Sequence, residues 1–410
     1  MEIQMAWRNV WRNPKRTVLT ILAIAFACIL LVFMLSLQFG TYETMINSAV
    51  KTRTGHLQIL IDGYDTDRKM RKVISHPDPI RKILNETPGI SGYTFRANGF
   101  ALLSSDHRTY GGIVTGIDPD QELLVSSGGS TIRKGDYLTS SDTNMAIIGS
   151  LLARNLKVDI GDELVMLGSA KDGSVAATVL IIKGIFSSGM DEYDRSAIQI
   201  PLSYFKEVFA MGEAVHQGVI ICDTLGSVKF VQREISQKLP APKGNKKLVC
   251  RSWDELIPGL MQSIQMDLGG GIIFYAILII VVAFSIMNTF VIAVFERTHE
   301  LGTLIAIGAK PGRLTKMLLY ESAFLTACGI AAGILAGSIL TIYAQYSGIP
   351  LGDAEGMLRQ YGIPGLIRPK LSLISALAGP CIVFIITLIS ALYPAVMVHK
   401  LNPVEAMRTP

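Results

Sequence analysis

Four long apolar stretches divide this sequence. They cover residues 18–40, 268–295, 317–343 and 371–398, and Glu321 is the one formally charged residue within them. A helix needs about 20 consecutive, largely apolar residues to cross the hydrocarbon core of a bilayer. The pattern therefore predicts a membrane protein with four transmembrane helices.

The region between the first two stretches, residues 41–267, has mixed polarity and is long enough for a large domain. Runs rich in β-branched residues alternate there with short amphipathic runs, which predicts an α+β domain inserted between the first two transmembrane helices. The predicted strands cover residues 56–61, 145–149, 163–167 and 176–182, and the predicted helices cover residues 78–85, 151–156, 205–209 and 228–239.

Basic residues next to the predicted spans indicate their orientation, because positively charged flanks are retained in the cytoplasm. Lys and Arg are clustered in the amphipathic segment at residues 1–17, in residues 296–316 and in the tail at residues 399–410. We therefore place these segments in the cytoplasm, which puts the domain at 41–267 and the loop at 344–370 outside it. The loop carries three basic residues of its own, which argue weakly in the opposite direction.

The composition agrees with a membrane protein that carries a soluble domain. Hydrophobic residues make up 50% of the chain, and Lys plus Arg exceed Asp plus Glu by only 38 to 33. So small a surplus does not suggest nucleic acid binding. The five cysteines form no C-x-x-C pair that would indicate a zinc or redox site. Cys222 and Cys250, both in the outside domain, are either two free thiols or a disulfide.

Groups that could carry catalysis or hold a metal are scarce in the domain. Its histidines lie too far apart in sequence for a metal-ligand pattern, which favours structural roles. Residues 191–194 hold three carboxylates, which form either a cation site or a solvated loop. Residues 168–174 contain Gly and Lys but lack the G-K-[ST] ending of a nucleotide-binding loop. We therefore expect no enzyme activity, cofactor or metal in this chain. The widely spaced histidines of the domain, for which structural roles are favoured, are His56, His76, His107 and His216.

Three motifs carry a family resemblance. Residues 296–302 read Glu-Arg-Thr-His-Glu-Leu-Gly, residues 401–408 read Leu-Asn-Pro-Val-Glu-Ala-Met-Arg, and residues 7–9 (Trp-Arg-Asn) and 12–14 (Arg-Asn-Pro) precede the first span. Their order and placement resemble those of FtsX-like, MacB-type ABC transporter permeases. In that family an E-R-x-x-E-[IL]-G motif opens the cytoplasmic element that couples the permease to its ATPase.

Within this superfamily, the chain is most similar to the Lol-type lipoprotein-releasing permeases (LolC/LolE). That likeness rests on residues 184–194, with support from residues 147–153, 158–162 and 252–256. The resemblance implies a multi-pass protein of the bacterial inner membrane, with a periplasmic domain, that extracts lipoproteins from the outer leaflet. Two other functions stay open: a MacB-like exporter of peptides or toxins with a periplasmic adaptor, and an FtsX-like signalling subunit that controls a cell-wall hydrolase. The size of the outside domain argues against the signalling subunit.

The resemblance also implies partners. They are a cytoplasmic ABC ATPase dimer that binds ATP and Mg²⁺, a second permease copy or a paralogue, a lipoprotein, membrane lipids, and a periplasmic carrier or adaptor. The sequence does not decide between two identical permease chains and two different ones.

The motif at residues 296–302 supplies the candidate coupling residues, which are Glu296, Arg297, Glu300 and Gly302. Arg297 and Glu300 can make charge-assisted hydrogen bonds to a partner surface. The alternative is that they only cap helix ends or form ion pairs within the chain.

Glycines mark two further places. Gly329, Gly333 and Gly337 recur every fourth residue, which predicts close packing of the third span on another helix, although membrane helices also tolerate glycine in general. Three consecutive glycines at residues 269–271 predict a hinge or a flexible linker before the second span. Glu321 should face protein or water, or reach the membrane interface, because a carboxylate is costly in lipid.

The first and second spans are expected to frame the mouth through which a lipid anchor enters. The candidate acyl-chain contacts are apolar residues at that level, and ordinary lipid-facing or core packing is the alternative for each. They are Met34, Leu35, Phe39, Phe274 and Ile277.

Overall fold

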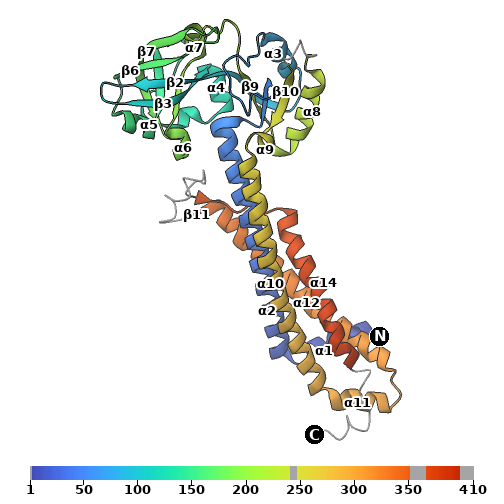
Figure 1. Ribbon diagram of the computed structural model, residues 1–410. Coiled ribbons are helices and arrows are strands. Elements are labelled where there is room, and N and C mark those ends of the chain that lie inside the picture. Colours follow the sequence, from blue (N-terminus) through green and yellow to red (C-terminus); the bar gives the residue numbers. More distant parts are fainter. Residues whose placement is uncertain (1, 241–246, 351–365, 398–410) are drawn as a thin grey trace. The chain divides into compact units, whose positions relative to one another are not determined.

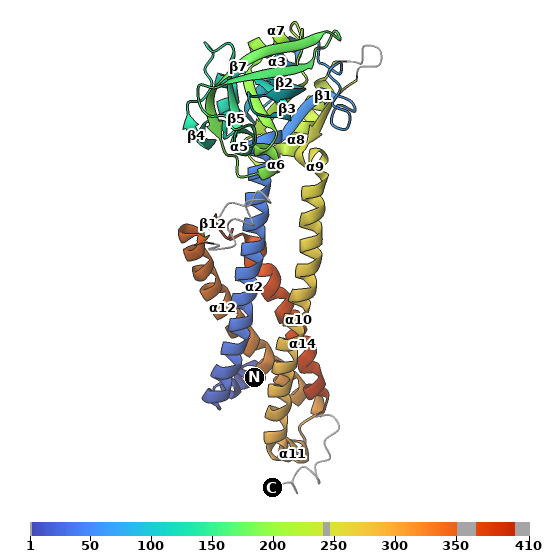
Figure 2. The ribbon, with the colours of Figure 1, turned by 60° about the vertical axis from the view of Figure 1, so that its left-hand side comes forward.

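A computed structural model describes residues 2–240, 247–350 and 366–397. These residues divide into two compact units, a helical unit and an α+β unit (Figures 1 and 2). The boundaries fall between residues 43 and 44, within helix α2 (Pro14–Ala49), and between residues 262 and 263, within helix α10 (Pro258–Glu296). Each unit is described by itself below.

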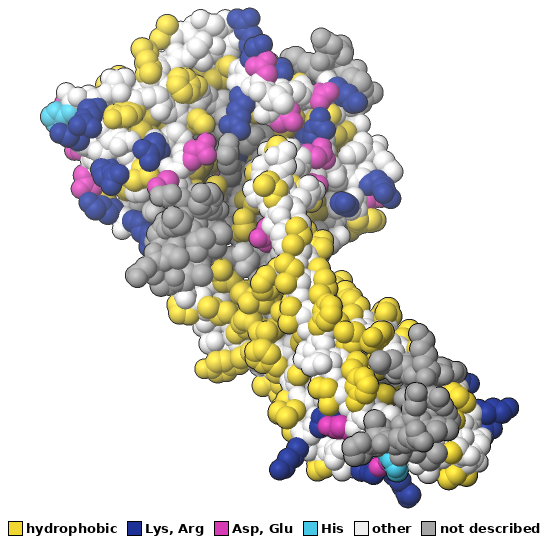
Figure 3. All heavy atoms as spheres, turned by 60° about the horizontal axis from the view of Figure 1, so that its bottom comes forward, with side chains coloured by type: hydrophobic (Ala, Val, Ile, Leu, Met, Phe, Trp, Pro, Cys, Tyr) yellow, Lys and Arg dark blue, Asp and Glu magenta, His cyan; other side chains and the backbone are white. Residues whose placement is uncertain are grey.

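The helical unit contains the apolar stretches of the sequence. Among the described residues, four helices are long and apolar enough to cross a membrane, namely α2, α10, α12 and α14. This agrees with the predicted number of spans, and Figure 3 shows apolar side chains along these helices. The remaining bounds in this unit are α1 (Glu2–Val10), α11 (Thr298–Ala306), α12 (Pro311–Ser347), α14 (Leu373–Met397), β11 (Ile349–Pro350) and β12 (Leu366–Ile367).

The first three helices extend beyond their predicted spans, because helical structure continues where the apolar run ends. The span predicted at 18–40 lies inside α2, the span at 268–295 inside α10, and the span at 317–343 inside α12. Residues 351–365 of the predicted loop, and the predicted tail with its motif at 401–408, lie outside the described residues.

The prediction of a hinge or flexible linker at residues 269–271 is wrong. All three lie inside the continuous helix α10. A side chain at Gly271 would meet the Gln38 amide at 2.8 Å, so this glycine makes room for a polar side chain of α2. Nothing lies within 4 Å of the corresponding positions at Gly269 and Gly270.

The glycines at every fourth residue of α12 lie against α2. A Cβ atom at Gly333 would stand 2.5 Å from the Cβ of Cys28, and one at Gly329 would stand 2.7 Å from the Cβ of Ile24. At Gly337 the nearest atoms of α2 would be 3.2 Å away. These distances leave no room for a side chain, so the backbones of α12 and α2 approach closely. All three glycines are buried.

The α+β unit is built on one sheet, in which the described residues form ten strands. The strand order is β10-β1-β9-β2-β3-β8-β5-β7-β4, and β6 pairs with β2 and β7. The strands are β1 (Leu57–Ile61), β2 (Ile90–Ser104), β3 (Thr109–Ile117), β4 (Ile132–Gly135), β5 (Met145–Gly149), β6 (Glu163–Ser169), β7 (Val175–Phe186), β8 (Ala197–Pro201), β9 (Gln217–Cys222) and β10 (Leu248–Ser252).

Short helices connect these strands. They are α3 (Asp78–Asn85), α4 (Pro119–Val125), α5 (Ser150–Leu156), α6 (Asp191–Asp194), α7 (Leu202–Val208), α8 (Val228–Lys238) and α9 (Trp253–Leu256), with single turns η1 (Val50–Thr54), η2 (Gly128–Thr131) and η3 (Leu225–Ser227). The predicted strand at 145–149 and the predicted helix at 78–85 are confirmed with identical bounds. The predicted strands at 163–167 and 176–182 are confirmed as β6 and β7, which pair with each other antiparallel.

One face of the sheet carries two apolar cores. The first includes Leu103, Leu164 and Ile198 with Phe205 of α7, and the second joins β1 and β9 to helices α3 and α8. Strand alternation places every second residue of each strand on this face. The other face of β1, β9, β2, β3 and β8 is mixed, with polar residues such as Arg96 and Gln199 beside buried apolar residues such as Leu60 and Ile117.

The histidines and cysteines of the domain contribute to this packing. His216 is fully buried, its Nδ1 accepts a hydrogen bond from the Asn98 amide, and burial lowers its pKa to about 4. His56 is also buried and accepts from the Cys222 amide, whereas His76 and His107 are exposed. Cys222 and Cys250 are both free and buried in the second core. The disulfide that the sequence left open is therefore not formed here.

The carboxylates at 191–194 fit the predicted solvated arrangement only in part, because they lie on the short helix α6 and one of the three is buried. Asp194 is 2% exposed and accepts hydrogen bonds from the Ser188 amide at 2.9 Å and the Ser188 hydroxyl at 2.6 Å. It therefore fixes its own loop, while Asp191 and Glu192 are exposed. Among the described residues, no three His, Cys, Asp or Glu side chains are placed to hold a metal ion.

The glycine contacts predict a position-specific effect of adding a single methyl group. Gly333→Ala should lower the free energy of unfolding by about 1–3 kcal/mol, because its Cβ would overlap Cys28 and the Ala25 carbonyl. Gly312→Ala, in the same helix with nothing within 4 Å, is the matched control and should not destabilise the protein. Denaturation of the purified chain in mixed micelles measures both. Equal stability of the two variants would contradict the packing.

Candidate functional site

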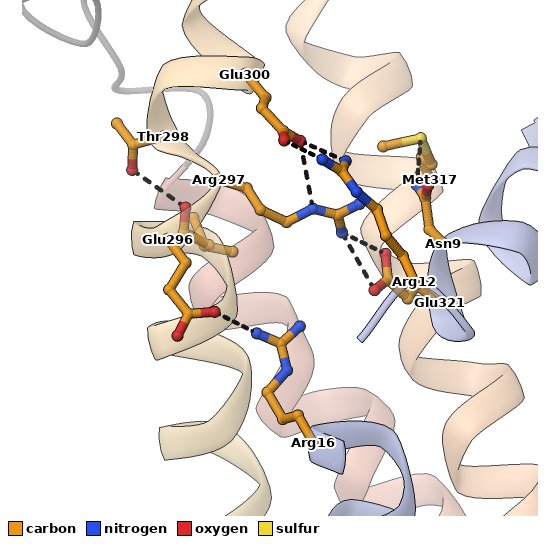
Figure 4. A network of polar contacts seen from close by, with 10 residues as sticks. Asn9, Arg12, Arg16, Glu296, Arg297, Thr298, Glu300, Met317 and Glu321 are labelled. Carbon is orange, nitrogen blue, oxygen red and sulfur yellow. Dashed lines mark hydrogen bonds and ion pairs between the residues drawn. The ribbon is translucent and has the colours of Figure 1, made fainter. Parts of the chain in front are cut away.

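A network of ion pairs lies at one end of the helical unit, where four chain segments meet (Figure 4). The segments are the turn between α1 and α2, the start of α2, the junction of α10 with α11, and α12. The residues that make the ion pairs are Arg12, Arg16, Glu296, Arg297, Glu300 and Glu321.

The pair between Arg297 and Glu321 is the most buried of the network. Arg297 follows the last residue of α10, and its Nη1 lies 3.0 and 3.2 Å from the two carboxylate oxygens of Glu321 on α12. The side chains are 14% and 6% exposed. A carboxylate in an apolar helix bundle needs such a partner, because an uncompensated buried charge costs several kcal/mol. Of the alternatives for Glu321, contact with protein is the one observed.

Two more pairs bind the N-terminal segment to the coupling element. Arg12 donates two hydrogen bonds to the Glu300 carboxylate, one of them at 2.8 Å, and Arg16 donates to Glu296 at 2.7 Å. Glu300 also lies 3.8 Å from Arg297. Hydrogen bonds from Arg12 are the main reason that the pKa of the Glu300 carboxyl is lowered. Glu300 thus stands between two guanidinium groups and connects the α1–α2 turn to α11.

The candidate coupling residues therefore have partners within the chain. Arg297 points inward to α12, Gly302 is buried, and Glu296 and Glu300 pair with the N-terminal segment. This is the arrangement of internal ion pairs that the sequence left as the alternative. Sequence alone missed it because the partners lie far away along the chain, 288 residues apart for Arg12 and Glu300.

The coupling element also exposes large apolar residues, beside the charged residues of the network. Ile307 is 80% exposed and Leu304 is 43% exposed, although both lie outside the helices that could span the membrane. Gly308, with φ of 102°, ends α11 in a left-handed turn that closes through the Gly308 amide on the Ile305 carbonyl. The turn leaves Ile307 at the tip of the segment. Its sequence signal is an isoleucine directly before Gly-Ala-Lys, a pattern that does not by itself predict a contact.

A second polar cluster joins α2 to α10 farther along the same helices. Tyr42 donates to the Asp267 carboxylate, Gln38 donates to the same carboxylate at 3.0 Å, and Tyr275 donates to the Gln38 oxygen at 3.0 Å. This cluster, Gln38, Tyr42, Asp267 and Tyr275, holds the two helices that were expected to frame the mouth.

The candidate acyl-chain contacts lie on the same two helices. Phe274 is 54% exposed, Ile277 is 57% exposed and Met34 is 37% exposed. Leu35 and Phe39 are half-buried. The first three thus face outward from the helical unit, and their contact with an acyl chain remains a prediction.

Known proteins share both parts of this architecture. Residues 17–237 match the family described as MacB-like periplasmic core domain, which is more than half of the chain, and residues 272–403 match the family described as FtsX-like permease C-terminal. The chain belongs to the FtsX-like, MacB-type family of ABC transporter permeases. The order of these two regions is the order that the sequence motifs predicted.

Relatives of two kinds resemble this permease. The lipoprotein-releasing system transmembrane protein LolC of Neisseria meningitidis is 22% identical over 412 residues, which cover 96% of this chain and 94% of LolC. The macrolide export ATP-binding/permease protein MacB of Bdellovibrio bacteriovorus is 24% identical, covering 99% of this chain but 61% of MacB. A solved structure of the periplasmic region of MacB from Actinobacillus actinomycetemcomitans aligns with 53% of the chain at 14% identity and a TM-score of 0.36.

The buried ion pair of this permease predicts strong coupling between two substitutions. Arg297→Leu and Glu321→Leu should each lower the free energy of unfolding by about 3 kcal/mol, because each leaves one buried charge unpaired. The double variant should lose much less than the sum of the two. Denaturation of the four proteins in mixed micelles gives the coupling energy, and additive losses would show that the pair does not form.

Proposed function

We propose that this chain is the transmembrane subunit of an ABC transporter that extracts lipoproteins from the outer leaflet of the bacterial inner membrane. The observation that supports this most is the similarity to LolC, which extends over nearly the full length of both chains. The MacB relatives are described as combined ATP-binding and permease proteins, and this chain spans only part of their length. A separate ATPase dimer would then supply the ATP hydrolysis.

In the proposed orientation both termini and the ion-pair network lie in the cytoplasm. Basic residues favour this, because Arg8, Lys15, Lys310 and Arg313 lie in the chain segments next to the network residues, and basic flanks stay inside. Figure 3 shows Lys and Arg side chains gathered at this end of the helical unit. The coupling element would then meet the ATPase, and the α+β domain would lie in the periplasm.

The exposed apolar tip of the coupling element is the proposed ATPase contact. An isoleucine that is 80% exposed outside the membrane is suited to insertion into a pocket of a partner. The charged residues behind it would transmit the motion rather than make the contact. A tilt of α11 would move Arg297 and Glu300, and through them α12 and the α1–α2 turn.

The polar cluster of Gln38, Tyr42, Asp267 and Tyr275 bears on where the lipid anchor would enter the permease. These hydrogen bonds hold α2 and α10 of one chain together. The lipid anchor would therefore reach the outward faces of these helices, where Met34, Phe274 and Ile277 are exposed, between this chain and a second permease chain.

A MacB-like exporter is the second candidate, and the match of residues 17–237 to the MacB-like core domain favours it. Both candidates need a partner ATPase and a moving periplasmic domain. They differ in cargo, since only the first requires an acyl-chain anchor.

Reconstitution tests the proposed function directly. The permease and its ATPase, placed in proteoliposomes that hold a triacylated lipoprotein, should release the protein when ATP is added. The same protein without its acyl chains is the control and should not depend on the transporter. ATP-driven export of a soluble peptide without release of the lipoprotein would favour the second candidate and overturn the first.

The docking contact predicts the effect of one substitution. Ile307→Asp should reduce ATPase co-purification and ATP-driven release about tenfold or more, because it places a charge in a desolvated apolar contact. Ile160→Asp is the matched control, an exposed isoleucine of the α+β unit that should leave both readouts unchanged. If Ile307→Asp assembles and releases like the parent, α11 does not contact the ATPase through its tip.

A further inference from the structure

A groove of about 310 Å³ lies between α2 and α10 within the helical unit, close to the ion-pair network. Both helices are long and apolar enough to cross a membrane, so the groove opens onto the bilayer rather than onto water. Its lining includes Arg16, Leu19, Thr20 and Ala23 on α2 and Ile286 and Thr289 on α10.

Beyond Arg16 the groove is largely apolar. It carries three hydroxyl groups, and two of them, on Thr20 and Thr289, already have partners. Each donates to the carbonyl of the residue four positions earlier in its own helix, at 2.9 Å. Hydroxyl groups bonded in this way offer a ligand little further hydrogen bonding. This part of the groove is therefore suited to a hydrocarbon chain.

One end of the groove is positively charged. Arg16 stands there in the first turn of α2, 27% exposed, and it donates one of its several N–H groups to Glu296 at 2.7 Å (Figure 4). The three guanidinium groups and three carboxylates of the network balance each other. Arg8 and Lys15, both exposed, add positive charge beyond that balance. The remaining donors of Arg16 can therefore bind an anion.

Two tryptophans mark the depth of this charged end in the membrane. Trp7 of α1 and Trp11 of the following turn are 43% and 49% exposed, and exposed tryptophans gather where headgroups meet hydrocarbon. The apolar run of the first span begins at Val18, two residues after Arg16. Arg16 thus stands at the level of the lipid headgroups, and the groove leads from there into the hydrocarbon.

The charge at one end argues against a second copy of this chain as the occupant. In a dimer with a twofold axis along the membrane normal, equivalent residues lie at equal depth. A contact through this groove would then bring Arg16 and Lys15 of the two chains toward each other, and like charges at an interface are unfavourable. A phospholipid has the matching order of groups, with an anionic phosphate followed by an acyl chain.

We propose that this groove binds one anionic phospholipid, with its phosphate on Arg16 and an acyl chain between α2 and α10. In the orientation proposed above, the lipid comes from the cytoplasmic leaflet, whereas the lipoprotein anchor lies in the outer one. The proposal needs only a membrane protein and is independent of the cargo. A lipid bound there joins α2 to α10 beside the pair of Arg16 and Glu296, at the end of the bundle that carries the coupling element.

Native mass spectrometry of the full-length chain, released from mild detergent micelles, tests the charged end. The probes are dioleoyl-phosphatidylglycerol and dioleoyl-phosphatidylcholine, which share their acyl chains and differ in net charge. One phosphatidylglycerol should bind about fivefold or more tightly than phosphatidylcholine, and Arg16→Gln should remove this preference. Glu296→Gln is the matched control, because it breaks the same ion pair but keeps the cation. It should bind phosphatidylglycerol at least as tightly as the parent does.

A second pair of variants tests the apolar part of the groove. Ala23→Phe fills the groove and should weaken binding of both lipids about tenfold. Leu22→Phe is its control, at an exposed position outside the lining, and should bind as the parent does. Both positions are exposed, so neither change should disturb the fold.

Four results would overturn the proposal. They are equal binding of the two lipids by the parent, an unchanged preference in Arg16→Gln, the same loss in Glu296→Gln as in Arg16→Gln, and unchanged binding in Ala23→Phe. The third result would leave Arg16 with a structural role alone. A dimer that Ala23→Phe dissociates would likewise contradict the proposal and assign the groove to a second chain.

Discussion

The buried ion pair between Arg297 and Glu321 is the interaction on which the arrangement of the helical unit depends. Glu321 lies in an apolar helix, where an unpaired carboxylate would be strongly unfavourable. Its partner stands at the α10–α11 junction, so the direction of α11 is fixed relative to α12. Glu300 extends this constraint to Arg12 and thereby to the α1–α2 turn. Three segments that are distant in sequence are thus held as one end of the bundle.

The ion pairs of the network differ in solvent exposure and therefore in how much each contributes to stability. Exposed pairs such as Arg12 with Glu300 contribute little to stability on average, whereas removing one partner of a buried pair is costly. The outer pairs can therefore open during a conformational change, while the inner pair persists. Close packing of α12 on α2 through glycines adds a second rigid contact. Motion applied to α11 would accordingly reach α2, the helix whose chain continues into the α+β unit.

The sequence predicted the features that depend on local pattern. Apolar length located all four candidate spans, and alternation or capping located strands such as β5 and helices such as α3. The glycine repeat predicted a packing face, but not that α2 would occupy it. The partners of Arg297 and Glu300 could not be predicted, because they lie in other segments of the chain, on α12 and in the α1–α2 turn, and any of several carboxylates or guanidiniums would have satisfied the same chemistry.

The sheet of the α+β unit shows the same limit. Gln217 lies opposite Arg96, and Thr115 lies opposite Gln199, only because the strand order places β9 beside β2, and β8 beside β3. Long-range pairing of this kind is not encoded in any short window. Ile307 was missed for a different reason, since an isolated apolar residue next to a charged motif gives no periodic signal.

The central claim is that the ion-pair network and the tip of α11 face the cytoplasm, and cysteine labelling tests it most directly. In a background without the five native cysteines, single cysteines at Ile307, which is 80% exposed, and at the exposed Asp172 of the β6–β7 turn would be treated with an impermeant maleimide in intact cells. The account predicts labelling at position 172 and none at 307 until the inner membrane is permeabilised. Labelling at 307 in intact cells would contradict it.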